Sequence, residues 1–90
     1  MLNVRIDQFI WPAGIEDKVR AKHGLLREEV EEAFFHQEAK SRRIGDRYML
    51  LSRSAGGNYI VVIFEFAART VTVISARPMN NREKRLFRRK

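Results

Sequence analysis

The chain has 90 residues, of which 44% are hydrophobic, and this is enough for one small domain with its own core. It has no cysteine, which excludes disulfides, a thiolate metal site and a thiol nucleophile, and no apolar run approaches the ~20 residues that span a bilayer. The net charge of +7 favours a nucleic acid or an acidic protein as partner, and we expect a single cytoplasmic domain over residues 1–90 without a signal peptide.

The first part of the chain predicts one strand and two helices. Alternating apolar residues indicate a strand that runs to Trp11, where Pro12 ends it. Residues 15–23 have acids in the first turn and cations in the last, as the helix dipole favours, and Gly24 suits the end of that helix. Residues 27–35 predict a second helix with an apolar face and four glutamates toward solvent. No histidine stands at metal-ligand spacing from these glutamates, so we expect no metal and no cofactor.

The second part predicts a meander of strands followed by a helix. Residues 36–45 are polar and cationic, which indicates a loop. Three strands separated by short turns are then expected at 47–53, 59–66 and 69–76. The middle strand is nearly all apolar, so it should be central and covered on both faces. Asn80 precedes the last helix, and the order β-α-α-β-β-β-α predicts an α+β fold in which helices pack on an antiparallel sheet.

Positive charge gathers at the end of the chain. From Arg82 onward there are six cations and one acid, so +5 of the net +7 lies in the last nine residues. Arg77 ends the last predicted strand, where Pro78 fixes it. Its guanidinium could bind a phosphate through two nitrogens, or it could pair with Glu83 to hold the last helix, and the sequence leaves both interpretations open.

Other side chains could take part in proton transfer or RNA binding. Lys22 and His23 stand at a helix end, where histidine can act as a general acid or base. The alternative is that both cations only stabilise the helix by interacting with the negative end of its dipole. Tyr48, Tyr59 and Phe87 are candidate stacking surfaces for unpaired bases. Because the strands that carry Arg47, Arg69 and Arg77 are neighbours in the meander, we expect some of the remaining arginines to lie on the same side as the terminal helix; these are Arg42, Arg43, Arg47, Arg53 and Arg69.

Several motifs in this order resemble the BrnT family of small bacterial toxins, which belong to the RelE-like superfamily of endoribonucleases in type II toxin–antitoxin systems. The matching segments cover nearly the whole chain. They are Phe9-Ile-Trp11, Lys22-His-Gly24 with the glutamate-rich helix after it, Asp46-Arg-Tyr-Met-Leu50, Val73-Ile-Ser-Ala-Arg-Pro-Met79 and the basic terminal helix.

The resemblance implies a metal-independent endoribonuclease that cleaves RNA, inhibits translation and arrests growth. It also implies a hetero-oligomer with a small antitoxin, often one with a ribbon–helix–helix DNA-binding part. Carried over to this sequence, the family's basic positions match Lys22, His23, Arg69, Arg77 and the terminal helix from Arg82. We expect the catalytic residues to be Lys22, His23, Arg69 and Arg77, and the RNA-binding residues to be Arg47, Arg82, Arg85 and Arg88.

Two positions depart from the family pattern. The family often has a tryptophan–acid pair opening the first helix, whereas here Trp11 is followed by Pro12. Phe87 stands where members frequently have tyrosine, and a phenyl ring neither donates nor accepts a proton. Tyr48, Tyr59 or His23 would then have to move the proton. The alternative function is a catalytically inactive basic module that docks an antitoxin or a nucleic acid. A DNA-binding repressor is a weaker third class, because no helix-turn-helix is recognisable.

Overall fold

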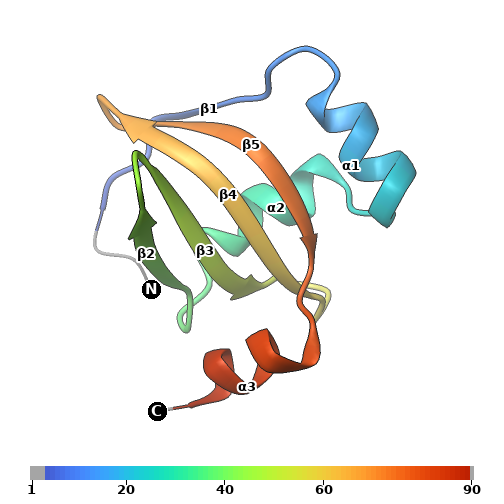
Figure 1. Ribbon diagram of the computed structural model, residues 1–90. Coiled ribbons are helices and arrows are strands. Elements are labelled where there is room, and N and C mark those ends of the chain that lie inside the picture. Colours follow the sequence, from blue (N-terminus) through green and yellow to red (C-terminus); the bar gives the residue numbers. More distant parts are fainter. Residues whose placement is uncertain (1–3, 90) are drawn as a thin grey trace.

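The computed structural model describes residues 4–89 of the chain (Figure 1). In chain order its strands and helices are β1 (Gln8–Ile10), α1 (Ile15–His23), α2 (Arg27–Ala33), β2 (Lys40–Ile44), β3 (Arg47–Arg53), β4 (Tyr59–Ala67), β5 (Thr70–Pro78) and α3 (Asn81–Arg88). The predicted α+β class is confirmed, as are the three helices and the three strands of the meander. The first strand is shorter than expected, since only three of its residues pair.

All five strands form one sheet in the order β1-β5-β4-β3-β2. From β2 to β5 the neighbours are antiparallel, but β1 pairs with β5 in parallel, from Gln8 opposite Thr70 to Ile10 opposite Thr72. The sheet is therefore mixed rather than purely antiparallel, which corrects the prediction. The reason is the path of the chain: α1 and α2 carry it from one edge of the sheet to the other, and the meander then returns strand by strand to lie beside β1 (Figure 1).

The strand β2 was predicted as a loop, and that prediction was wrong. Its side chains are exposed along most of its length, so it shows none of the apolar alternation by which a half-buried strand is recognised. The signal that was missed is the turn after it. Ile44 pairs with Arg47 across the two residues Gly45 and Asp46, and Gly45 has a φ of 65° at the first turn position, as in a type II′ hairpin.

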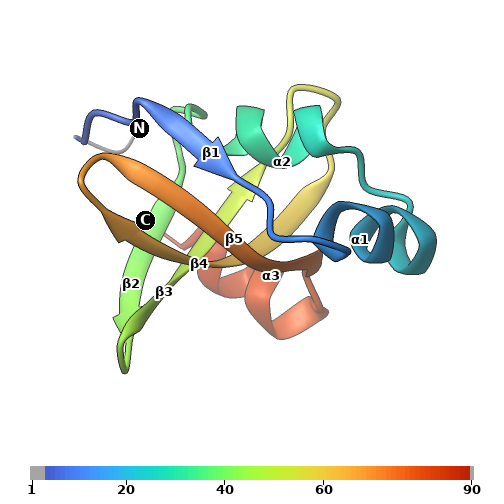
Figure 2. The same ribbon diagram turned by 90° about the horizontal axis from the view of Figure 1, so that it is seen from above.

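The sheet lies between helices on its two faces (Figure 2). On one face, α1 and α2 cover the larger apolar cluster, in which Phe34 packs edge-on against Phe9 and Phe64 with ring centroids 5.3 and 4.9 Å apart. The other face carries α3 through a smaller cluster of Leu51, Val61, Met79 and Phe87. The prediction that β4 is central and covered on both faces is thereby confirmed.

The C-terminal end of α3 is held by a lysine from the far edge of the sheet. Lys40 Nζ donates hydrogen bonds to the carbonyl oxygens of Leu86, Phe87 and Arg89 at 3.3, 2.8 and 2.6 Å. A cation at this end of a helix satisfies carbonyls that lack a partner and also answers the helix dipole. Lys40 therefore fastens α3 to β2.

Replacing this lysine by an apolar residue of similar length should weaken the attachment of α3. We expect Lys40→Met to lower the free energy of unfolding by about 1–2 kcal/mol, because the carbonyl groups lose a charged donor. Urea denaturation followed by circular dichroism would measure it. Arg42→Met is the matched control, since Arg42 lies two residues along the same strand and, within residues 4–89, forms no hydrogen bond or ion pair with α3. An equal loss in both variants would show that Lys40 has no special part.

Within residues 4–89, no helix is long and apolar enough to cross a membrane.

Candidate active site

A polar cleft of about 410 Å³ opens where four segments of the chain meet. These are the end of α1, the β3–β4 turn, the end of β5 and the first turn of α3. Figure 1 shows these segments gathered at one end of the sheet. Three side chains that can carry charge or exchange protons line the cleft, namely His23, Tyr59 and Lys84. This is the place where the fold brings a predicted proton-transfer residue next to the basic terminal helix.

His23 reaches the cleft because α1 ends sharply after it. Gly24 adopts a φ of 69°, a left-handed conformation that favours glycine, and its N–H bonds the carbonyl of Arg20 at 2.8 Å. Leu25 is then buried, which turns the chain back toward the sheet. His23 also lines a smaller hollow of about 170 Å³ between α1 and β5, and Lys22 lines that hollow rather than the cleft. The predicted pair is thus adjacent, but only His23 opens onto the larger site.

Tyr59, the first residue of β4, is surrounded by cations. Its ring centroid lies 4.9 Å from the guanidinium carbon of Arg53, 5.1 Å from that of Arg88 and 5.7 Å from Lys84 Nζ. Phe87 packs edge-on against the same ring at 5.9 Å. Phe87, which stands where the BrnT family frequently has tyrosine, is therefore in contact with a tyrosine of β4, Tyr59.

These cations favour the ionised form of the phenol. A hydrogen bond from Arg88 Nη2 to Tyr59 Oη, at 3.5 Å the outer limit for such a bond, is the largest cause that lowers the pKa of Tyr59. Loss of hydration on burial opposes this shift, the charges of Arg88 and Arg53 lower the pKa further, and Glu38 raises it slightly. Tyr59 is therefore easier to deprotonate than a tyrosine in water.

The cluster of Arg53, Lys84 and Arg88 carries positive charge that the protein itself does not neutralise. Among residues 4–89, none of the three forms an ion pair with a carboxylate. The Nε atom of Arg53 is also buried without a hydrogen-bond partner in the described part of the chain. Cations gathered beside a polar cleft suit a phosphate group, whose oxygens can accept hydrogen bonds from their exposed nitrogens.

Arg77 makes a two-pronged ion pair with Glu83. Its Nη1 and Nη2 donate to the two carboxylate oxygens, both at 2.7 Å, and Glu83 Oε1 also accepts the backbone N–H of Asn80 at 2.9 Å. Asn80 Oδ1 accepts in return from the Glu83 N–H at 2.8 Å, which completes a capping box at the start of α3. Of the two interpretations that the sequence left open, the structure shows the one in which Arg77 holds the last helix.

A β-bulge turns Arg77 toward α3. Ser75 lies opposite Ile63, but Val73 lies opposite Phe64, so Ile74 is an extra residue in β5. Val71 and Val73 face the larger core. Without the bulge, residue 77 would share their face, since a shift of one residue moves every later side chain to the other side of the sheet.

The pairing of Arg77 with Glu83 should make α3 sensitive to acid. The hydrogen bonds from Arg77 are the largest cause that lowers the pKa of Glu83 in the folded protein; partial burial opposes the shift, and the hydrogen bond from Asn80 adds to it. Ionised Glu83 therefore stabilises the fold above the ordinary glutamate pKa of about 4.3, and this contribution is lost as the pH falls through the lowered value. Melting temperatures of the wild type and Glu83→Gln, compared from about pH 7 to pH 3, should converge in acid. A constant gap would contradict the assignment.

The other predicted arginines lie elsewhere. Arg69 stands in the β4–β5 turn and pairs with Asp7 at 3.0 Å, and Arg47 pairs with Glu65 at 3.9 Å. Arg69 lies at the opposite end of β5 from Arg77, roughly 25 Å away at the usual rise per residue. Arg47 lies two strands away from β5, about level with Thr72. Of the arginines expected on the side of the terminal helix, Arg53 does lie there, against the Tyr59 ring that Arg88 of α3 also faces. Arg69 and Arg47 do not, because the antiparallel meander carries them toward the other end of the sheet.

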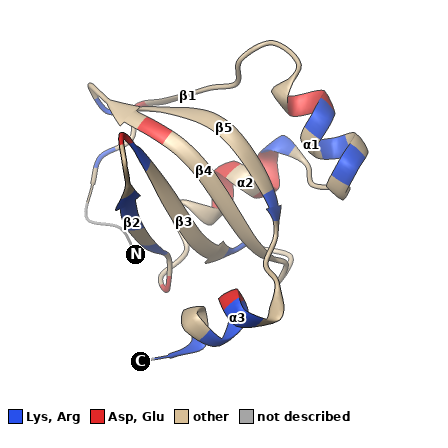
Figure 3. Ribbon diagram, viewed as in Figure 1, with Lys and Arg blue, Asp and Glu red and all other residues tan. Residues whose placement is uncertain are grey.

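The predicted RNA-binding residues of α3 are exposed. Arg82, Arg85 and Arg88 are all solvent-accessible on this helix, and Figure 3 shows the basic colouring of α3. Arg88 alone of these joins the cluster around Tyr59. Sequence reasoning did not single out Lys84 and Arg53, although signals existed: Lys84 and Arg88 are four residues apart on one helix face, and Arg53 pairs with Tyr59 across a hairpin turn.

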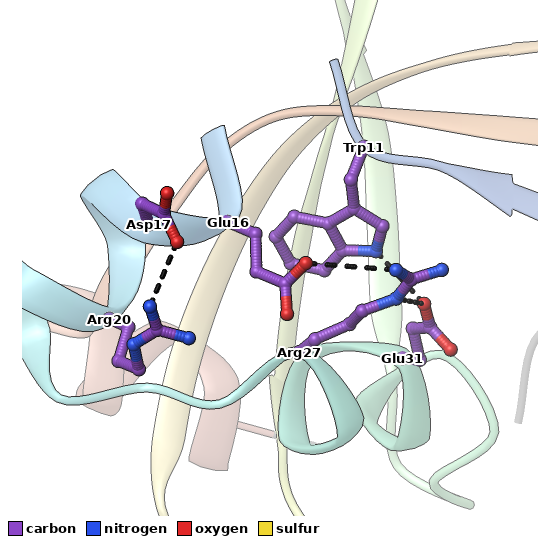
Figure 4. A network of polar contacts seen from close by, with 6 residues as sticks. All are labelled: Trp11, Glu16, Asp17, Arg20, Arg27 and Glu31. Carbon is purple, nitrogen blue, oxygen red and sulfur yellow. Dashed lines mark hydrogen bonds and ion pairs between the residues drawn. The ribbon is translucent and has the colours of Figure 1, made fainter. Parts of the chain in front are cut away.

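Acids of α1 and α2, on the face of the sheet opposite α3, take part in a network around Trp11 (Figure 4). The indole N–H of Trp11 donates to Glu31 at 2.9 Å, and Arg27 Nε donates to the same carboxylate at 2.9 Å. Arg27 also lies 3.7 Å from Glu16 of α1. Trp11 therefore links the segment after β1 to α2. No group of three or more potential metal ligands occurs within the described residues.

Comparison with known proteins places this fold. No family model matches the chain, and no curated protein matches it. Solved structures do: the fold is that of a small BrnT-like toxin, as the sequence motifs predicted. The chain is similar to the crystal structure of the ribonuclease toxin BrnT of Brucella abortus, with a TM-score of 0.65 and 28% identity, over 82% of this chain and 97% of that one.

Proposed function

We propose that this protein is the toxin of a type II toxin–antitoxin system and that it acts as a metal-independent endoribonuclease. Its similarity to a ribonuclease toxin supports the class. The observation that supports the activity is the cleft itself, which His23, Tyr59 and Lys84 line. Arg53 and Arg88 lie against the Tyr59 ring, and these two arginines and Lys84 have no carboxylate partner among residues 4–89. Such a site offers proton transfer and charge stabilisation together.

The chemistry proposed is attack of an RNA 2′-hydroxyl on the adjacent phosphate. Tyr59, whose pKa is lowered by Arg88, takes the 2′-hydroxyl proton, and His23 gives a proton to the departing 5′-oxygen. The oxygen–phosphorus bond to the next nucleotide breaks, leaving a 2′,3′-cyclic phosphate and a 5′-hydroxyl. Lys84, Arg88 and Arg53 stabilise the negative charge that builds up on the phosphate oxygens.

In this proposal, the arginines expected from the sequence to be catalytic have other roles. Arg77 acts as a positioning residue, since it holds the first turn of α3 and with it Lys84 and Arg88. Arg69 and Arg47 lie too far from the cleft to touch the same phosphate. Lys22 remains beside His23, where its charge can attract the RNA backbone.

The proposed setting is the cytoplasm, where a toxin of this class meets RNA and its antitoxin. We propose a small antitoxin, with a ribbon–helix–helix part, as the protein partner in a hetero-oligomer, and RNA as the substrate whose loss inhibits translation.

The competing function is a basic module without catalytic activity. Phe87 favours it, because this ring is 5% exposed and offers no proton at a place where the family frequently has tyrosine. In that case the same cations would hold a nucleic acid or an acidic protein without breaking a bond.

Incubation of the purified protein with single-stranded RNA in EDTA, with and without ribosomes, separates the two. We expect cleavage that leaves 2′,3′-cyclic phosphate ends, and no cleavage of RNA whose 2′-hydroxyls are methylated, because the nucleophile is then blocked. RNA that is bound but never cut in either condition would establish the binding module instead.

A further inference from the structure

We infer that the exposed edge of β2 is a docking site for an acidic, extended segment of a partner protein, which adds to the sheet as a sixth strand. This inference concerns a surface apart from the cleft. Figure 1 shows β2 at the margin of the sheet remote from α1, and Figure 3 shows basic residues along it. It was the one strand of the described chain whose sequence gave no sign of burial, and its residues stay exposed in the fold.

The backbone of β2 offers unused hydrogen-bonding groups. Ile44 and Arg47 close a two-residue hairpin, so these two residues exchange hydrogen bonds. In an antiparallel pair such exchange occurs at alternate positions, and Ser41 and Arg43 therefore direct their N–H and C=O groups away from β3. No other segment among residues 4–89 bonds these groups. An added strand would complete the pattern, as in recognition of extended peptides at sheet edges.

The side chains of β2 select acids. Arg42 and Arg43 are both exposed, and neither forms an ion pair within the described residues. Arg43 is held in place, because its Nε donates to the carbonyl of Gly45 at 2.9 Å and its guanidinium lies 5.7 Å from the Tyr48 ring. Since successive side chains of a strand point to opposite faces, each arginine would pair with one acidic side chain on its own face of the incoming strand.

An apolar hollow lies beside the same edge. Its volume is about 400 Å³, and it lies on the face that carries α2. It runs from Ser41 over Tyr48 to Phe64 and Phe66, and the segment before β1 bounds it through Val4 and Ile6. Ser41 is small, so a large apolar side chain opposite it could reach this hollow. The edge therefore fits a segment with two successive acids, opposite Arg43 and Arg42, followed by an aromatic residue opposite Ser41.

Other occupants fit less well. A second copy pairing through β2 would bring arginines of both chains together, and like charges across a strand pair are unfavourable. RNA could be attracted by the arginines, but it carries no strand to pair with Ser41 and Arg43. The acidic peptide satisfies the backbone, the charges and the hollow together.

Fluorescence anisotropy with the full chain tests the inference. The probe is a labelled peptide of threonine and valine with Glu-Glu-Phe at its centre. We expect it to bind, and we expect binding to weaken about tenfold or more when both acids become glutamine, because two ion pairs are lost. N-methylation of the peptide nitrogens that face β2 should weaken binding at least as much, because it removes the strand's donors.

Variants of the protein locate the site. Arg42→Glu with Arg43→Glu should abolish binding, whereas Lys18→Glu with Arg20→Glu, an equal change of charge on α1, should leave it within about twofold. Ser41→Pro removes one outward N–H at an edge position where proline can be accommodated, and should also weaken binding. On addition of the peptide, the amide hydrogens of Ser41 and Arg43 should exchange more slowly.

Several results would overturn the inference. The first is that the N-methylated peptide binds as tightly as the unmodified one, and the second is that the α1 variant weakens binding as much as the β2 variant does. The third is that, without peptide, the amides of Ser41 and Arg43 exchange more slowly as the protein concentration rises. The fourth is that an RNA oligonucleotide protects the same amides. The last two would assign the edge to a second copy or to nucleic acid. No RNA cleavage is involved in the assay, so this inference and the proposed activity can each fail alone.

Discussion

Tyr59→Phe should lower the rate of RNA cleavage by about 10²–10⁴-fold, the range that positioned acid–base groups usually contribute. The substitution removes only the phenolic oxygen. The ring remains to pack edge-on against Phe87 at 5.9 Å and to face the cations of Arg53, Lys84 and Arg88, so folding and RNA binding should change little. Single-turnover cleavage with excess protein would measure the chemical step apart from binding.

Tyr48→Phe is the matched control. Tyr48 is the other tyrosine of the chain, and its ring stacks on Phe64 at 5.5 Å, outside the cleft. This variant should cleave at nearly the wild-type rate. If both variants or neither lose activity, Tyr59 has no special part in proton transfer.

The pH dependence gives a second readout of the same role. A base acts in its deprotonated form, so the wild-type rate should rise with pH until the lowered pKa of Tyr59 is reached. Arg88→Met should move this rise to higher pH, because the hydrogen bond and the charge that lower the pKa are then gone. In Tyr59→Phe the rise should disappear. A rise that persists there would belong to another group.

Most of the fold could be predicted from local sequence patterns. The helix dipole and Gly24 defined α1, and the apolar run of β4 identified the central strand, because both depend on neighbours in sequence. The strand β2 was not predicted from the sequence, because an edge strand needs no apolar face. Its hairpin turn at Gly45 held the only local signal.

The site was less accessible to sequence reasoning. His23 could be proposed from its place at a helix end, and Tyr59 only as one of two tyrosines. Whether Arg77 meets RNA or Glu83 depends on the bulge at Ile74, and nothing in the run of β-branched residues around it marks an extra residue. Arg69 shows the same limit: chain neighbours of a motif can lie at the far end of a strand.

Glu83→Ala should separate the two roles of Arg77, because they predict opposite results. If Arg77 holds α3, removing its partner loosens the first turn of the helix, withdraws Lys84 and Arg88 from Tyr59, and lowers cleavage. If Arg77 binds RNA directly, the same change frees its guanidinium, and cleavage stays equal or increases. We expect the first result, with cleavage reduced about tenfold or more through lost charge stabilisation.

Stability should change in parallel and without additivity. We expect Arg77→Ala and Glu83→Ala each to lower the free energy of unfolding by about 1–3 kcal/mol, less than for a fully buried pair because the Arg77 side chain is 44% exposed. The double variant should lose little more than either single one, since the shared ion pair is already broken. Arg85→Ala removes the same charge from an exposed position of α3 and should cost within about 0.5 kcal/mol. Additive losses, or a Glu83→Ala protein that cleaves RNA faster, would make Arg77 a direct contact of the substrate.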